Sequence, residues 1–134
     1  MRGIVANDSE EAMYMARAKD QNGDSITSEH TYELHFPLGQ APPAKYFWSL
    51  TVYDQYANLM LNDYDRYAIS GNSKDLIYED DGSLRILIGG KPPEGMVGNW
   101  LPAGESFTRV TLRVYGPEKA MVERTWKPPQ LRRL

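Results

Sequence analysis

Arginine and aromatic residues are the side chains of this sequence with the clearest capacity to bind a ligand. Arg66 precedes Tyr67, and Arg113 lies two residues before Tyr115. An arginine on a strand can pair with a carboxylate or stack on an aromatic ring. One interpretation is therefore a structural ion pair between Asp54 and either arginine. The other is a concave site for an anionic or sugar-like ligand, because aromatic faces suit sugar rings and arginines would fix the orientation; its candidate residues are Trp48, Tyr53, Asp54, Arg66, Tyr67, Trp100 and Arg113.

Acidic residues raise the alternative of paired-carboxylate catalysis, as in glycoside hydrolases. Asp80 and Asp81 belong to a turn sequence, and Asp54 ends a strand, where its carboxylate can accept hydrogen bonds from turn amides. Asp63 and Asp65 complete the set. We interpret these acids mainly as turn residues, and a hydrolase acting on carbohydrate or peptide stays the alternative.

Histidine and cysteine usage limits metal and nucleophile chemistry. Glu33 and His35 are two residues apart on one expected strand, so both side chains point to the same side and could share a metal ion. The only other histidine is His30, there is no cysteine, and no Gly-x-Ser-x-Gly segment occurs. The sequence therefore predicts no catalytic residue, no metal and no cofactor.

Alternating apolar residues predict the strands that would position these side chains. The central strand is residues 47–54, with Trp48, Leu50 and Val52 on one face. Residues 31–36 and 107–115 alternate in the same way. Residues 76–78 and 83–88, joined by a turn containing Asp81-Gly82, are expected to pair as a hairpin. Trp100 is expected to anchor the loop before it.

The two ends of the chain have weaker patterns. Residues 7–13 are expected to form a short helical turn, because acidic residues favour a first helical turn. Residues 14–18 fit a strand or a continued helix. Near the C-terminus, Trp126 with Pro128-Pro129 is expected to pack the tail on the body or on a neighbouring subunit, and Arg132-Arg133 to be a solvated tail.

Length and charge narrow the class of protein. The chain has 134 residues, a net charge of −3 and an acidic pI near 5.4, which together predict one domain over residues 1–134 with no nucleic-acid partner. No apolar run reaches the roughly 18 residues that span a bilayer, and no signal-peptide core follows Met1. We therefore expect no membrane partner and, by default, a cytoplasmic location. Short strands about ten residues apart, separated by glycine and proline, predict an all-β sandwich or barrel.

Seven ordered motifs resemble the domain of unknown function 1214 across about residues 7–129: Pro42-Pro43, Phe47-Trp48-Ser49-Leu50-Thr51-Val52-Tyr53-Asp54, Arg66-Tyr67-Ala68-Ile69, Asp81-Gly82-Ser83-Leu84, Asn99-Trp100-Leu101-Pro102, Leu112-Arg113-Val114-Tyr115-Gly116-Pro117 and Thr125-Trp126-Lys127-Pro128-Pro129. The resemblance implies a jelly-roll-like antiparallel β-sandwich, usually the C-terminal half of two-domain proteins, and implies no catalytic residue. The sequence lacks the N-terminal partner domain, lacks an Asn-Pro step over residues 61–65 and has a shortened loop at 89–97.

These observations together predict a non-catalytic binding or assembly module. Self-association into a homo-oligomer would replace the interface that the family forms with its partner domain. The fold class by itself assigns no function, because β-sandwiches host many unrelated ones.

Overall fold

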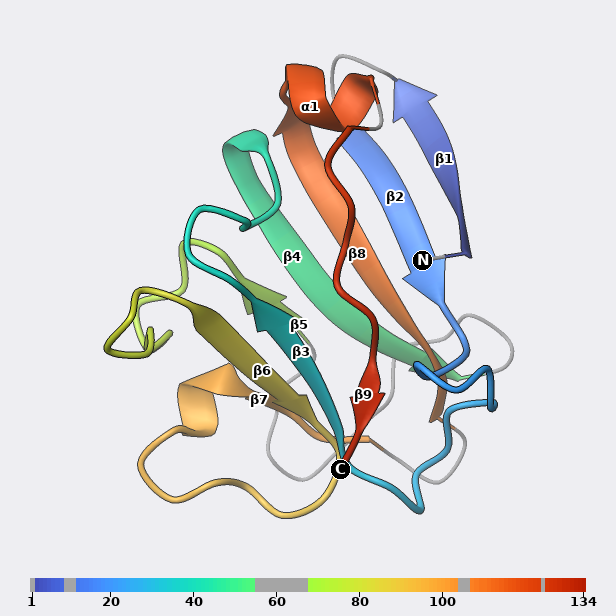
Figure 1. Cartoon of the computed structure of the whole chain (residues 1–134), viewed down its shortest axis with the longest axis vertical. Helices are drawn as coiled ribbons and strands as arrows, with labels where there is room; N and C mark the ends of the chain where they lie inside the picture. The colour runs from blue at the N-terminus through green and yellow to red at the C-terminus, as the bar shows by residue number, and fades with distance from the viewer. Residues whose placement is uncertain (1, 9–11, 55–67, 104–106, 124) are drawn as a thin grey trace.

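The chain forms two β-sheets packed face to face (Figure 1). The structure is a computed structural model that describes residues 2–8, 12–54, 68–103, 107–123 and 125–134. One sheet has the strand order β1 (Arg2–Asp8), β2 (Ala12–Arg17), β8 (Phe107–Pro117), β4 (Ala44–Asp54), β5 (Ala68–Ser70). The other has the order β7 (Trp100–Leu101), β6 (Leu84–Ile88), β3 (Tyr32–Phe36), β9 (Arg132–Arg133). The pairs are antiparallel except β6 with β7, and two short helices, η1 (Val97–Asn99) and α1 (Lys119–Val122), complete the described elements.

Strand alternation places the core as the sequence predicts. Trp48, Leu50 and Val52 of β4 are buried, and so are the inward residues of β3 and β8. The rings of Phe36 and Trp48 lie 5.9 Å apart and join the two sheets. The expected all-β sandwich is therefore confirmed, because each sheet buries one apolar face against the other.

The N-terminal segment differs from the expected helical turn. Its first residues, 7 and 8, end β1, and residues 12 and 13 begin β2, while residues 9–11 lie outside the described part. β1 pairs with β2, and β2 pairs with β8. Met13 and Met15 alternate inward along β2, so the ladder and the buried methionines outweigh the acidic helix-start signal.

The hairpin around Asp81 is only half formed. Its turn is present, with Glu79 N–H donating to Ser83 O (2.9 Å) and Gly82 at φ 84°. β6 follows the turn as expected, but residues 76–78 are not a strand. β6 instead pairs with β3 and β7, because those strands share its buried face.

The C-terminal residues 125–134 form a strap along the sandwich (Figure 1). Trp126 Nε1 donates to Gln40 O (3.0 Å), and Leu131 is fully buried. The expected packing of the tail on the body is thus present. Arg132 and Arg133 have exposed side chains, but their backbone forms β9 rather than a free tail, pairing with Tyr32 and Glu33 of β3.

Candidate functional site: a polar groove on the four-stranded sheet

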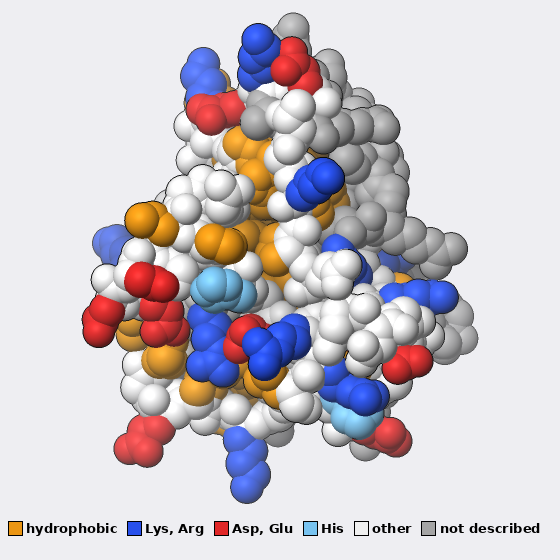
Figure 2. Space-filling model, in the orientation of Figure 1, with side chains coloured by type: hydrophobic (Ala, Val, Ile, Leu, Met, Phe, Trp, Pro, Cys, Tyr) orange, Lys and Arg blue, Asp and Glu red, His pale blue; other side chains and the backbone are white. Residues whose placement is uncertain are grey.

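The candidate site begins with the outward residues of β3. Because Tyr32, Leu34 and Phe36 are buried in the core, the residues that alternate with them, Glu33 and His35, point away from it. Arg85 of β6 lies directly opposite His35 in the ladder. Figure 2 shows basic, acidic and histidine side chains gathered on this side of the molecule. Two neighbouring strands thus fix an acid, an imidazole and a guanidinium on one rigid face.

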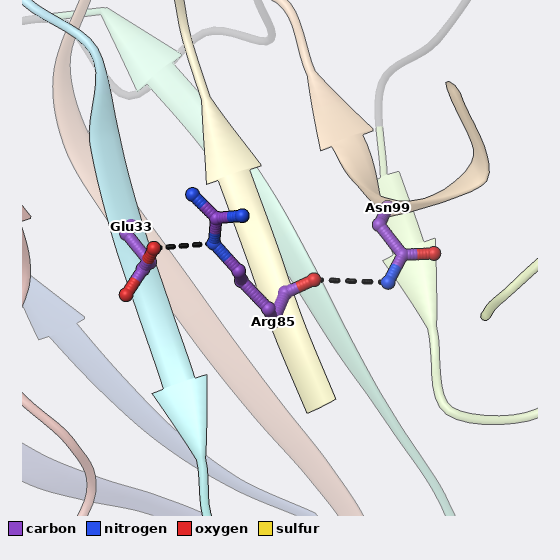
Figure 3. Close-up of polar contacts among 3 residues, drawn as sticks. All are labelled: Glu33, Arg85 and Asn99. Atoms are coloured by element: carbon purple, nitrogen blue, oxygen red, sulfur yellow. Dashed lines mark hydrogen bonds and ion pairs between the residues drawn. The ribbon is translucent and has the colours of Figure 1, made fainter. Parts of the chain in front are cut away.

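An ion pair organises the centre of this face. Nε of Arg85 donates a hydrogen bond to Oε2 of Glu33 (Figure 3). The Glu33 side chain is 12% exposed and that of Arg85 39% exposed. Among the described residues the two terminal guanidinium nitrogens have no hydrogen-bond partner. The charge of Glu33 is therefore already compensated, while Arg85 keeps donors free.

The strap adds the second wall of a groove of about 390 Å³, lined by Gln21, Glu33, His35, Pro129, Gln130 and Arg132. Gln21 is held in place, because its N–H donates to Leu131 O (2.8 Å) and its Oε1 accepts from Arg133 N–H (2.9 Å). Its amide NH₂ therefore stays available as a donor. The guanidinium of Arg132 has no acidic partner within the described ranges. The groove is consequently rich in donors and carries one uncompensated positive charge.

A second, acidic hollow of about 440 Å³ adjoins this groove at His35 and is lined by His35, Glu79, Asp80, Asp81, Ser83 and Arg85. Asp81 accepts hydrogen bonds from Ser83 Oγ (2.6 Å) and Ser83 N–H (2.9 Å). These bonds, with a smaller electrostatic contribution from the nearby His35, lower the pKa of the Asp81 carboxyl. His35 therefore separates a basic groove from an ionised acidic turn.

The two tryptophans of the sequence-predicted site belong to the interior. Trp48 is 5% exposed on the inner face of β4, and Trp100 is 1% exposed. Trp100 Nε1 donates to Gly89 O (2.9 Å), which confirms that it anchors the loop before it. Both rings are thus used for packing.

The other predicted residues lie elsewhere. Tyr53 and Arg113 are on the outer face of the five-stranded sheet, away from the core-facing tryptophans. Asp54 ends β4 opposite Phe107, and its side chain lies outside the description, as do residues 66 and 67. The two buried tryptophans and the outward-facing Tyr53 and Arg113 therefore do not line one concavity, and ligand binding by any of these four residues stays a prediction.

From the sequence, Glu33 and His35 are candidates only for binding a metal ion. Across the described ranges no third histidine or acid joins them in a metal-binding group. Arg85 and Arg132 were missed as site residues. The alternation of β6 already marked Arg85 as outward-facing, whereas the strap's return to β3 had no sequence signal.

The chain's family follows from comparison with known proteins. Residues 11–119 match the model of the family described as "Protein of unknown function (DUF1214)". The chain belongs to the DUF1214 family. No curated protein matches this DUF1214 chain. The part of the chain that the structure describes contains no helix with the length and apolar character to span a membrane.

Solved structures show the same fold. The VPA0106 protein of Vibrio parahaemolyticus is 23% identical, with a TM-score of 0.80 over 93% of this chain and 31% of that one. An uncharacterized protein of Burkholderia cenocepacia is 16% identical, with a TM-score of 0.54 over 97% of this chain and 31% of that one. The chain thus spans about a third of each of these longer proteins, and the likeness concerns the fold alone.

Proposed function

We propose that this DUF1214 domain is a non-catalytic binding module that holds a small hydroxylated carboxylate, such as a sugar acid, in the polar groove. One observation carries the proposal: Arg132 has no acidic partner in a groove where the described carboxylate, Glu33, already pairs with Arg85. An anion is the natural partner of such a charge, because guanidinium–carboxylate hydrogen bonds are about twice as strong as neutral ones.

The remaining lining suits hydroxyl groups. The amides of Gln21 and Gln130 and the imidazole of His35 offer both donors and acceptors around Arg132. Glu33 and His35 are fixed by β3, and Gln21 is fixed by its bonds to the strap. A ligand therefore meets side chains that are largely positioned in advance, which lowers the entropy cost of binding.

The hydrolase alternative has less support. Its aromatic cleft would need Trp48 and Trp100, and both are buried in packing contacts. A general acid also needs a raised pKa, whereas the pKa of Asp81 is lowered by its bonds with Ser83. These two observations make a binding module the better explanation of the groove.

Glucuronate is a suitable probe, because it combines a carboxylate with sugar hydroxyls. Titration into the isotope-labelled chain, followed by two-dimensional amide NMR, is expected to shift the resonances of Gln21, His35 and Gln130 in a saturable way. Glucose has the hydroxyls without the charge, and it is expected to bind at least tenfold more weakly.

Paired arginine variants locate the site. Arg132→Ala is expected to weaken glucuronate binding roughly tenfold or more, since it removes the uncompensated charge. Arg133→Ala is the matched control, because the adjacent strand residue does not line the groove. Shifts that do not saturate, equal binding of glucose, or equal effects of the two variants would overturn the proposal.

A further inference from the structure

The outer face of the five-stranded sheet is a surface of arginines and aromatic rings separate from the groove. Phe47 stacks on Tyr115 with ring centroids 4.4 Å apart. The guanidinium of Arg113 lies 5.2 Å from the ring centre of Tyr14, its ladder neighbour on β2. The guanidinium of Arg109 lies 6.0 Å from the ring centre of Tyr53, its ladder neighbour on β4. We call this surface, formed by Tyr14, Phe47, Tyr53, Arg109, Arg113 and Tyr115, the arginine face.

The arginine face carries positive charge without a described counter-charge. Nε of Arg113 is buried and has no hydrogen-bond partner among the described residues. Neither Arg109 nor Arg113 forms an ion pair within those residues. Carboxylates supplied from outside would therefore stabilise the face by pairing with the guanidinium groups of Arg109 and Arg113.

A surface with the complementary character occurs on the same chain. Residues 77–80, at the turn before β6, expose Ile77 (44%) and Tyr78 (50%) beside exposed Glu79 and Asp80. Leu38 is 71% exposed and lies against this turn at Gly82. Figure 2 shows acidic side chains beside hydrophobic ones on that side of the molecule. We call this set, Leu38 with residues 77–80, the acidic tip.

We propose that copies of this chain associate head to tail, with the acidic tip of one copy seated on the arginine face of the next. The tip supplies carboxylate acceptors for Arg109 and Arg113 and apolar side chains for the aromatic rings. A two-fold contact of one arginine face with another would instead place like charges together. Contacts between two different surfaces build a ring or a filament rather than a closed dimer.

Light scattering of the full chain at rising concentration tests this assembly. The wild-type chain is expected to form oligomers that dissociate at about 1 M salt, where screening acts within roughly 3 Å. Arg113→Glu and Asp80→Arg are each expected to leave a monomer at the same concentration. The double variant restores opposite charges across the contact and is expected to recover association.

Lys119→Glu is the matched control, because it changes the net charge as Arg113→Glu does, at a side chain that is 85% exposed on α1. It is expected to leave the oligomer intact. Circular dichroism checks folding, and Asp80→Arg, in an exposed turn, keeps the test valid if Arg113→Glu fails to fold. A wild-type monomer at every concentration, or oligomers that the two reversals do not disturb more than the control does, would overturn the proposal.

Discussion

The side-chain amide of Asn99 links the backbone of residue 77 to the backbone of β6. Ile77 N–H donates to its Oδ1 (2.8 Å), and its Nδ2 donates to Ile77 O (2.7 Å) and to Arg85 O (2.9 Å). Asn99 itself is 1% exposed, so its amide is shielded from water on the Asn99 side of these bonds. One residue therefore attaches the segment before the acidic turn and holds the backbone of Arg85 at the groove (Figure 3).

Asn99→Ala is expected to lower the free energy of unfolding by about 1–3 kcal/mol, because it removes the hydrogen-bond partners of the Ile77 and Arg85 peptide groups. Urea denaturation measures the change. Asn72→Ala, at an exposed position, is the control and is expected to cost about 0.5 kcal/mol or less. A loss at Asn99 no larger than at Asn72 would show that the bridge contributes little.

The Asp81–Ser83 contact gives the turn a defined pH dependence. Its hydrogen bonds lower the pKa of Asp81 in the folded chain, so the contact stabilises the fold above the unfolded pKa of about 4 and is lost as the pH falls through the folded value. Asp81→Asn is therefore expected to be less stable than wild type at pH 7. The difference should shrink below about pH 4, as measured by urea denaturation across pH. A difference that stays constant with pH would contradict this.

At the scale of elements, the strap is a structural part of the sandwich. Leu131 is fully buried, and its carbonyl accepts the N–H of Gln21, which lines the groove. Leu134, three residues later, is 55% exposed. The two leucines have the same side chain and differ in burial, so a comparison of their alanine variants measures how much burial of the strap contributes to stability.

Leu131→Ala is expected to destabilise the fold by about 2–5 kcal/mol through lost burial and a cavity. Leu134→Ala is expected to change stability by about 0.5 kcal/mol or less. Thermal or urea unfolding compares the two. Similar small effects at both positions would mean that the strap is not part of the cooperative unit.

Strand alternation explains how much of the fold was predictable. Alternating runs such as Trp48-x-Leu50-x-Val52 turn one face of a strand inward whichever strand it pairs with. The β-sandwich class and most of its buried residues could therefore be predicted from the sequence. Pairing depends on distant residues, and this is why the partner of β6 was wrong. The site was less predictable still: the sequence favoured Trp48 and Trp100 for their chemistry, yet burial decides whether a ring is available.

At the scale of the whole molecule, β8 is the strand on which the larger sheet depends. It lies between β2 and β4 and pairs with both along most of its length. These contacts join residues 12–17 and 44–54 to residues 107–117, so the sheet is built from pairings that are distant in sequence. Such topologies fold more slowly than those built from local contacts.

The position of β8 has a consequence for synthesis of the protein. While the chain is made from its N-terminus, β2 and β4 exist before the strand that separates them has been translated. Both then present unpaired edges and apolar side chains, the condition that favours aggregation. The groove closes later still, because Pro129, Gln130 and Arg132, which line it, are translated after β8. We therefore expect the larger sheet to form only after β8 has been translated. Until then, chaperones meet a nascent chain whose hydrophobic strands are already made and still unpaired.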